Sequence, residues 1–363
     1  MTGRRTPGRD SRGWTVPATP YRPPRWLPGA HLQTIWPATL SPCPSIGWRR
    51  ERWDTPDGDF VDVDFADAGV GAGVEVGPAD ADVAGAGRDR PRAGARAPTL
   101  VLFHGLEGGS RSHYARAFAG AARRRGWRIA VPHFRGCSGE LNRAPRAYHS
   151  GDSAEIDWIL RRFARGATGG QPLVAVGVSL GGNALLKWLG EQREAARIVR
   201  AAAAISAPHD LHASAVALSR GFNLVYMRHF LKSLKRKSDA KLAQYPGLFD
   251  RRRMLRSRDF FDFDDAVTAP MHGFASCFDY WERSSCRRFL AGIRVPTLVL
   301  NARNDPFVPA RALAPRDEVS DLVTLDYPAE GGHAGFPQGL PPGRLDWLPR
   351  RTMDWLAGVL ADG

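Results

Sequence analysis

A short apolar segment followed by a stretch with helical periodicity recurs through most of this chain. The apolar segments lie at 99–103, 127–131, 173–178, 201–205, 296–300 and 322–327. A strand that is covered on both faces has such a composition, because neither side of it meets water. Repeated β-α units predict an α/β fold with a mainly parallel central sheet of about eight strands and helices on both of its faces.

Two further strands are expected ahead of this repeat, at 48–54 and 59–65. In the second segment, Val61, Val63 and Phe65 alternate with aspartates. Alternation with a period of two predicts a strand with one apolar face and one solvated face. These two segments bring the expected number of strands to about eight.

The remaining segments differ in composition from the repeat. Residues 1–20 are rich in Arg, Gly and Pro, which predicts a disordered basic tail. Residues 68–98 have no aromatic residue, Leu or Ile, which is typical of a flexible low-complexity insertion. Residues 208–272 have helical stretches without a strand signal, and we expect a helical cap over the carboxyl edge of the sheet. Residues 21–363 would then form a single domain with these two additions.

The segment Gly177-Val178-Ser179-Leu180-Gly181 matches the pattern G-x-S-x-G. It follows a wholly apolar strand and opens a helix, where a strained turn lifts a serine hydroxyl above the sheet. A structural serine in a glycine-rich connection is the alternative. The strand-to-helix context favours Ser179 as a nucleophile.

A serine hydroxyl needs a base, and the base needs a carboxylate that orients it. His333 lies in a glycine-flanked loop after the last predicted strand, and Asp305 follows the strand that ends at residue 300. We therefore predict Ser179, Asp305 and His333 as the catalytic residues. Asp210, which follows the preceding strand, is the weaker candidate for the acid.

An acyl-transfer site also needs two backbone N–H groups that stabilise an oxyanion. The residue after the nucleophile supplies one, and that residue is Leu180. The second is expected from Leu106, in the glycine-rich segment 104–109 after the strand at 99–103. A carboxylate facing the oxyanion would oppose catalysis, so Glu107 is expected to point away and to make a local hydrogen bond.

Other candidate groups are interpreted as structural. Cys137 lies in a serine-like motif without a following helix and is read as a packing residue. His209 and His212 have a metal-like spacing but no third ligand, which favours solvent-facing histidines of the cap. No phosphate-binding loop pattern occurs, and we expect neither a metal nor a cofactor.

Cysteine content and hydropathy indicate the cellular compartment in which the protein is expected. Four cysteines in 363 residues do not form a disulfide framework and suggest a reducing compartment. No run of 18 apolar residues is present, and residues 1–25 have no apolar core. These features predict a cytoplasmic protein.

The formal net charge is +14, and 46 of the 51 basic residues are Arg. Residues 220–258 carry twelve basic residues and two acids. A solvated helical face explains such a cluster without a ligand. The alternative is peripheral contact with an anionic membrane surface through Lys232, Lys235, Arg236 and Lys237. A nucleic-acid partner is not expected.

Several segments together resemble the YheT-like branch of the α/β-hydrolase superfamily. They are Leu27-Pro28-Gly29-Ala30-His31-Leu32-Gln33-Thr34-Ile35-Trp36-Pro37, His104-Gly105-Leu106-Glu107-Gly108, Phe134-Arg135-Gly136-Cys137-Ser138-Gly139-Glu140, and Phe263-Asp264-Asp265 with Thr268-Ala269-Pro270. The resemblance spans about residues 21–360 and implies an esterase or acyltransferase that uses Ser179, Asp305 and His333. The chain departs from the eukaryotic members of this branch by the segment 68–98 and by the expected lack of an N-terminal membrane anchor.

The function expected from the sequence is a serine hydrolase that cleaves short- to medium-chain acyl esters, with a small-molecule ester as its substrate. Transfer of the acyl group to a small alcohol would use the same acyl-serine intermediate. A non-catalytic protein that binds lipid surfaces on the same fold is the alternative from a different class.

Overall fold

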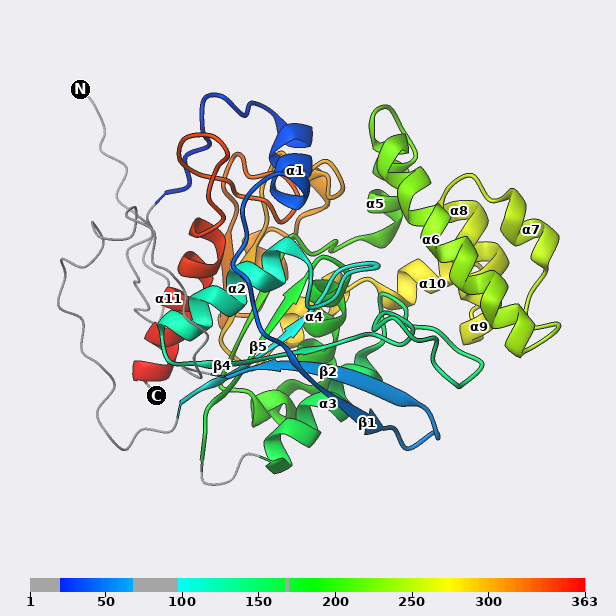
Figure 1. Cartoon of the computed structure of the whole chain (residues 1–363), viewed down its shortest axis with the longest axis horizontal. Helices are drawn as coiled ribbons and strands as arrows, with labels where there is room; N and C mark the ends of the chain where they lie inside the picture. The colour runs from blue at the N-terminus through cyan, green and yellow to red at the C-terminus, as the bar shows by residue number, and fades with distance from the viewer. Residues whose placement is uncertain (1–19, 68–96, 167–169, 363) are drawn as a thin grey trace.

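The computed structural model describes residues 20–67, 97–166 and 170–362. The predicted basic tail, residues 1–20, lies outside the described residues except for residue 20. The predicted insertion, residues 68–98, lies outside them except for residues 97 and 98. The described residues form one eight-stranded sheet flanked by helices, with a group of helices beside one edge (Figure 1). The predicted α/β architecture is therefore confirmed.

The strands of the sheet follow the order β1-β2-β4-β3-β5-β6-β7-β8. Their bounds are β1 (Arg49–Asp54), β2 (Phe60–Ala66), β3 (Thr99–Phe103), β4 (Arg128–Pro132), β5 (Leu173–Val178), β6 (Ala201–Ile205), β7 (Thr297–Leu300) and β8 (Val323–Asp326). The pairs β1–β2 and β2–β4 are antiparallel, and the other pairs are parallel. The carboxyl ends of the parallel strands therefore meet at one edge.

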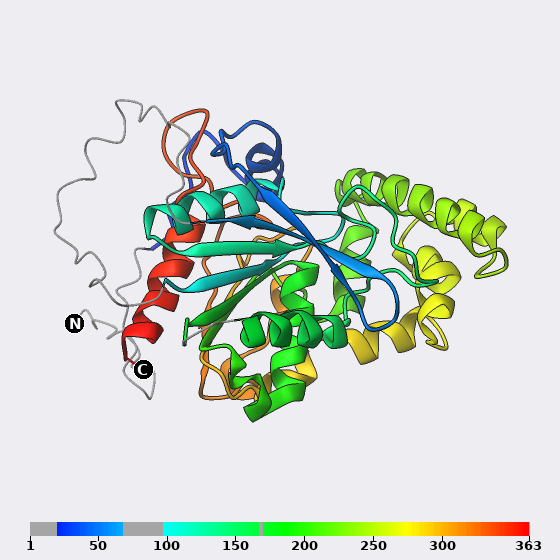
Figure 2. The same ribbon diagram turned by 60° about the horizontal axis from the view of Figure 1, so that its bottom comes forward.

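Helices cover both faces of the sheet (Figure 2). Helices α2 (His113–Arg124) and α11 (Trp347–Asp362) pack on one face, and α3 (Ser153–Gly166) and α4 (Leu180–Gln192) pack on the other. Along β3, Leu100 packs in the core beneath α2 and α11, and Val101 packs in the core beneath α3 and α4. Side chains alternate across a strand, so an unbroken apolar run supplies both cores.

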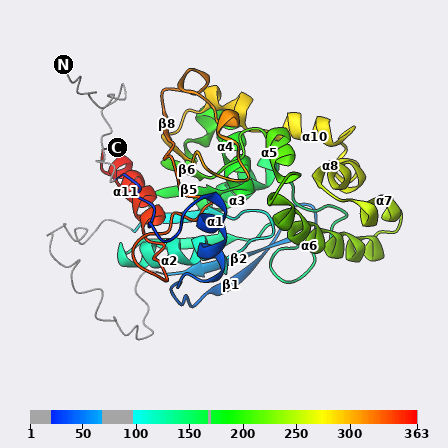
Figure 3. The ribbon, with the colours of Figure 1, turned by 90° about the horizontal axis from the view of Figure 1, so that it is seen from above.

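The cap is built from short helices around α6 (Figure 3). The cap helices are α5 (Leu211–Leu218), α6 (Asn223–Gln244), α7 (Arg251–Arg256), α8 (Phe260–Phe263), the π-helix η3 (Asp264–Thr268), α9 (Ala269–His272) and α10 (Cys277–Ser284). The remaining elements are α1 (Ala30–Thr39), η2 (Arg193–Ile198), η4 (Arg287–Gly292), η5 (Ala310–Ala312) and η6 (Arg316–Glu318). Helix α10 packs against α5, so the helical layer continues past residue 272. Among the described residues, no helix combines the length and the apolar character needed to cross a bilayer.

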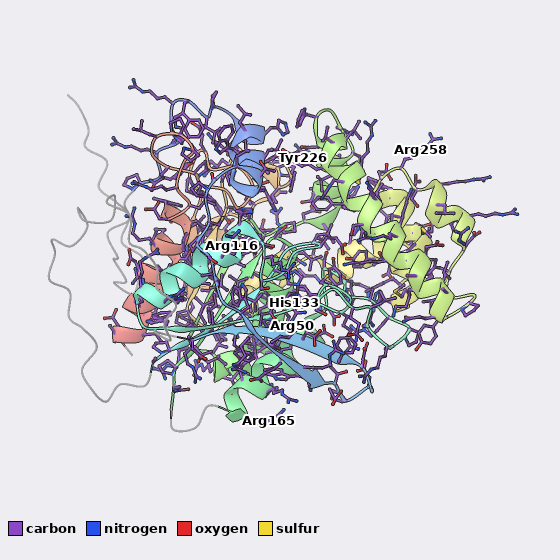
Figure 4. All side chains as sticks on the ribbon, viewed as in Figure 1. Arg50, Arg116, His133, Arg165, Tyr226 and Arg258 are labelled. Carbon is purple, nitrogen blue, oxygen red and sulfur yellow. The ribbon has the colours of Figure 1, made fainter. Side chains whose placement is uncertain are left out.

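The expectation of a half-solvated β2 is wrong, because the aspartates of this strand are buried as well. Asp62 and Asp64 are 2% and 3% exposed. Each pairs with an arginine of the neighbouring strand β1, Asp62 with Arg52 at 2.8 Å and Asp64 with Arg50 at 2.7 Å. A buried carboxylate needs such a partner, and the antiparallel register with β1 supplies it. Figure 4 shows Arg50 beside His133, whose Nε2 lies 2.8 Å from the Asp64 carboxylate.

The basic segment of the cap does not present all of its charges to solvent. Lys235 donates hydrogen bonds to the carbonyl groups of Leu255 and Ser257. Lys237 forms an ion pair with Glu107 at 2.8 Å. The expectation that Lys235 and Lys237 face an anionic surface is therefore wrong, since their ammonium groups are bound within the protein. Lys232 and Arg236 are exposed.

The helix that follows the predicted nucleophile packs unusually closely against η4. A Cβ atom built on Gly190 would lie 2.1 Å from the carbonyl oxygen of Phe289. Alanine normally favours a helix over glycine by about 1 kcal/mol. At this position we expect Gly190→Ala to lower the free energy of unfolding by about 1–3 kcal/mol, because backbone atoms must move apart.

Chemical denaturation would measure this change. Gly166→Ala is the matched control, because Gly166 ends helix α3 and a Cβ atom there meets no atom of the described residues within 4 Å. We expect the control to be neutral or stabilising. Equal stability of the two variants would contradict the close packing of α4 on η4.

Candidate active site

Ser179 lies on the turn between β5 and α4, as the sequence predicted. Its backbone has φ 55° and ψ −120°, a strained conformation for a residue with a side chain. A Cβ atom on Gly177 would lie 2.5 Å from the carbonyl oxygen of Gly181, and one on Gly181 would lie 2.5 Å from that of Phe103. The two glycines of the motif are therefore required by backbone contacts on either side of the serine.

The structure brings Ser179, Asp305 and His333 together. Oγ of Ser179 lies 2.9 Å from Nε2 of His333, and Oδ2 of Asp305 lies 2.8 Å from Nδ1 of the same ring. With Nδ1 protonated, the ring donates to Asp305 and accepts from the Ser179 hydroxyl. This arrangement has the geometry that a general base acting on a serine requires.

The second oxygen of Asp305 is also held. Oδ1 accepts hydrogen bonds from the backbone N–H groups of Phe307 at 2.8 Å and Val308 at 3.2 Å. These two bonds orient the carboxylate so that Oδ2 faces His333. The weaker candidate, Asp210, instead forms the N-cap of α5 and accepts from Ala213 N–H at 2.9 Å.

Leu180 directly follows Ser179 as the first residue of α4, and Leu106 lies on the loop after β3. Among the described residues, neither backbone N–H group has a recorded acceptor. The loop that carries Leu106 is fixed through buried His104, whose Nδ1 lies 2.7 Å from the Gly105 carbonyl and whose Nε2 accepts from Phe134 N–H at 3.0 Å. Burial lowers the pKa of His104 to about 3, so the ring stays neutral and keeps its acceptor nitrogen.

The expected local hydrogen bond of Glu107 is wrong, because its partners come from distant segments. Its carboxylate accepts from the Tyr148 hydroxyl at 2.8 Å, from Lys237 at 2.8 Å and from the Ser233 hydroxyl. Its backbone N–H donates to the Tyr148 oxygen at 2.9 Å. Glu107 therefore connects the loop of Leu106 with helix α6 of the cap.

Helix α1 holds the loops of the acid and the base, a role that no pattern in the sequence predicted. Gln33 is fully buried, and its side-chain oxygen accepts from Asn304 Nδ2 and Gly331 N–H, both at 3.0 Å. The hydroxyl oxygen of Thr34 accepts from His333 N–H at 2.9 Å. Both residues belong to the segment 27–37 that carried the family resemblance, so that segment held the signal for them.

Cys137 and the two spaced histidines do not form reactive sites. Burial raises the pKa of the Cys137 thiol to about 11, so it remains protonated. His209 is fully buried, which overturns the expectation of a solvent-facing side chain, and its Nδ1 accepts from Ala314 N–H at 2.9 Å. His212 is exposed as expected and stacks on Trp281. The described residues contain no group of three or more side chains that could hold a metal ion.

A cavity of about 140 Å³ lies between the sheet edge and the cap and reaches Ser179 and His333. Its apolar lining includes Leu218, Phe230, Leu234, Phe260, Phe263 and Phe307. One carboxyl group, that of Asp264, also lines it and accepts from Trp281 Nε1 at 2.8 Å and from the Thr268 hydroxyl at 2.6 Å. Burial raises the pKa of Asp264 to about 6.

Comparison with known proteins identifies the family to which this chain belongs. A family model described as the alpha/beta hydrolase fold matches residues 98–339. YheT of Escherichia coli, whose name assigns it an esterase activity, is 36% identical over 342 residues that cover 94% of each chain. The chain belongs to the α/β-hydrolase fold family. The expected resemblance of this α/β-hydrolase to the YheT-like branch is confirmed, and the matches support a hydrolase of the esterase type.

More distant relatives of this α/β-hydrolase include lipid-cleaving enzymes by name. Phospholipase ABHD3 of Mus musculus is 26% identical and matches 94% of this chain and 79% of that protein. Monoacylglycerol lipase ABHD2 of Mus musculus is 28% identical and matches 72% and 65%. Among solved structures, the Pyrococcus furiosus esterase Pf2001 aligns with a TM-score of 0.51 at 14% identity, over 86% of this chain and 91% of that one. The last similarity shows the fold alone.

Of the two candidate acids, Asp305 contacts His333, whereas Asp210 caps helix α5. We expect Asp305→Asn to lower ester turnover by about 10⁴-fold, because an amide in this position favours the wrong tautomer of the histidine. Asp210→Asn is the matched control and keeps a side-chain oxygen for Ala213 N–H, so its turnover is expected to stay near that of the unmodified protein. Initial rates with a chromogenic short-chain ester would measure both. A larger loss in Asp210→Asn would refute the assignment of the acid.

Proposed function

We propose that this α/β-hydrolase is a serine hydrolase that cleaves carboxylic esters through an acyl-serine intermediate. The observation that carries the proposal is the position of the His333 ring, within 2.9 Å of the Ser179 hydroxyl and 2.8 Å of the Asp305 carboxylate. Proton transfer, nucleophilic attack and orientation of the base can all start from this arrangement. The reaction needs no metal or cofactor.

In the first step, Ser179 Oγ attacks the ester carbonyl while His333 Nε2 takes the hydroxyl proton. The oxyanion that forms is stabilised by the N–H groups of Leu106 and Leu180. Collapse of this intermediate breaks the bond to the alkoxide, which receives the proton from His333 and leaves as the alcohol. Water then attacks the acyl-serine by the same route, releases the carboxylic acid and restores the hydroxyl of Ser179.

The pocket supports an acyl chain as the part of the substrate that enters the protein. Burying a hydrocarbon chain against the phenylalanines of the lining is favourable by about 25 cal/mol per Å² of apolar surface. The cavity of about 140 Å³ suits a short to medium chain. The names of the relatives, a phospholipase and a monoacylglycerol lipase, favour a glycerolipid-type ester as the substrate class.

Two alternatives share parts of this proposal. Transfer of the acyl group to a small alcohol proceeds through the same acyl-serine, with the alcohol replacing water in the second step. A lipid-surface binding protein without catalysis would need neither the base nor the acid beside Ser179. Product analysis in the presence of ethanol distinguishes hydrolysis from transfer.

Replacing the nucleophile tests the central claim. We expect Ser179→Ala to lower kcat by about 10⁴- to 10⁶-fold, because no covalent intermediate can form. A fluorophosphonate probe should label the unmodified protein at Ser179 and leave the variant unlabelled. Equal melting temperatures would show that the variant is folded. Retention of more than a tenth of the activity would refute the proposed mechanism.

We also propose that the N-terminal part of α6 contacts an anionic lipid surface. Four large apolar side chains lie exposed there and on α1, with 36–52% of their surface accessible: Leu32, Phe222, Leu224 and Val225. We call these four residues the apolar rim. Arg220 and Arg228 beside it are exposed, and no ion pair of their side chains is recorded among the described residues. Apolar side chains with flanking basic groups suit the interface of a negatively charged membrane.

The apolar rim lies close to the pocket. The Tyr226 side chain is labelled in Figure 4, and the centroid of its ring lies 4.7 Å from that of Phe307. The centroid of the Phe307 ring in turn lies 4.4 Å from that of His333. The Phe222 ring lies 4.6 Å from His31 of α1. A lipid surface that touches the rim would therefore lie near the catalytic histidine and could present its acyl esters there.

Vesicle binding would test the membrane contact. We expect binding to phosphatidylglycerol vesicles at low salt and weak binding to neutral vesicles, because each basic group near the surface contributes about 1 kcal/mol. The variant Arg220→Gln/Arg228→Gln should bind about 30-fold more weakly at an unchanged melting temperature. Arg252→Gln/Arg256→Gln is the matched control, with two exposed charges removed from α7. Equal binding of the two variants would contradict a role for the rim.

A further inference from the structure

A single carboxylate, that of Glu107, connects the loop of the second oxyanion donor to the cap. Glu107 directly follows Leu106, and its backbone has a φ of 57°, in the left-handed region. Its backbone N–H donates to the Tyr148 oxygen, so the peptide group that joins Leu106 and Glu107 is held at a fixed orientation. The conformation of the Leu106 loop therefore depends on groups outside the loop.

Two of those groups lie on one face of the cap helix α6. Ser233 and Lys237 are four residues apart and contact the two different oxygens of the Glu107 carboxylate. Residues at this spacing are neighbours on a helix surface. The ion pair is largely buried, with side-chain exposures of 26% for Lys237 and 11% for Glu107. Loss of one partner would therefore leave a charge in a poorly hydrated environment.

The position of this carboxylate has an electrostatic consequence for the reaction. Negative charge develops on the substrate oxygen close to Leu106 in the transition state, and an uncompensated carboxylate on the next residue would oppose it. The ammonium group of Lys237 compensates that charge at 2.8 Å from Oε1. Lys237 also lies 3.5 Å from the sulfur of Cys137, which is protonated and supplies no competing charge.

We propose that Ser233 and Lys237 of the cap are positioning residues for ester cleavage, which act through Glu107 to hold the Leu106 N–H group toward the oxyanion. The inference rests on the proposed function, because it assigns these residues to the oxyanion site of the same reaction. It implies that the oxyanion site is complete only while α6 is seated on the loop at 104–109. The cap thus contributes to the transition state as well as to the acyl pocket.

The test compares variants of Lys237 with a matched control. Lys237→Gln removes the charge, Lys237→Arg keeps it, and Arg252→Gln removes an exposed charge from another cap helix. The double variant Glu107→Gln/Lys237→Gln removes both charges. Ser233→Ala removes one hydroxyl and serves as the milder variant if Lys237→Gln does not fold. The readouts are kcat and KM for a short-chain ester, inhibition by a trifluoromethyl ketone, and the melting temperature.

We expect Lys237→Gln to lower kcat by about 10- to 100-fold with KM changed less than threefold, since one oxyanion donor is worth about 10²–10³ in kcat. The trifluoromethyl ketone forms an oxyanion on Ser179, so its inhibition should weaken by the same factor as kcat/KM. Lys237→Arg should restore most of the activity, and the double variant should be more active than Lys237→Gln alone. Ser233→Ala should lose kcat by a smaller factor, also at constant KM.

A purely structural contact would give a different pattern. The proposal is overturned if Lys237→Gln matches Arg252→Gln in kcat, if only KM changes, or if the double variant is the least active of the set. A fluorophosphonate probe applied for a long incubation measures the fraction of active protein in each sample. The proposal is also overturned if this fraction is smaller for Lys237→Gln than for the unmodified protein and the difference accounts for the loss of kcat. Failure of the proposed function itself would be recognised separately, because the unmodified protein would then neither turn over esters nor react with the probe.

Discussion

The close approach of backbone atoms at the ends of β3 and β5 is the constraint on which the site depends. These strands pair in parallel with Phe103 opposite Gly177, so the loop after β3 leaves the sheet beside the turn that carries Ser179. A Cβ atom on Gly105 would lie 3.1 Å from that of Ser179. Only small residues fit between these chains, and the same close approach brings the loop of Leu106 beside the turn that carries Ser179 and Leu180.

The sequence alone predicted the sheet and the three side chains at its edge, for one physical reason. Strands buried on both faces are apolar throughout, so the bounds of β3, β5 and β6 followed directly from the chain. In a parallel sheet the carboxyl ends lie at one edge, and polar residues that follow the strands converge there. This is why Ser179, Asp305 and His333 could be named together, although the last two lie far from the first in the sequence.

Features that depend on individual side-chain partners were not predictable in the same way. The burial of Asp62 and Asp64 depends on arginines that the register with β1 brings opposite them. The partners of Glu107 on α6 lie more than 120 residues away, and those of Gln33 on the His333 loop lie almost 300 residues away. Such contacts have no periodicity, so only a recurring family segment can indicate them. The burial of His209 was missed for the same reason.

The site is held by three parts of the fold that act on different groups. The sheet sets the turn of Ser179, and α1 fixes the His333 loop through Thr34. The cap reaches the loop of Leu106 through Glu107 and also lines the cavity at Ser179. Among the described residues, neither the His333 ring nor the Asp305 carboxylate forms a hydrogen bond with a cap helix, although Asn223 of α6 donates to the carbonyl of the neighbouring Pro306 at 2.7 Å. Under the proposed mechanism, a shift of the cap would alter chain binding and oxyanion stabilisation together. The proposed mechanism thereby links acyl-chain selectivity and transition-state stabilisation through one helix, α6.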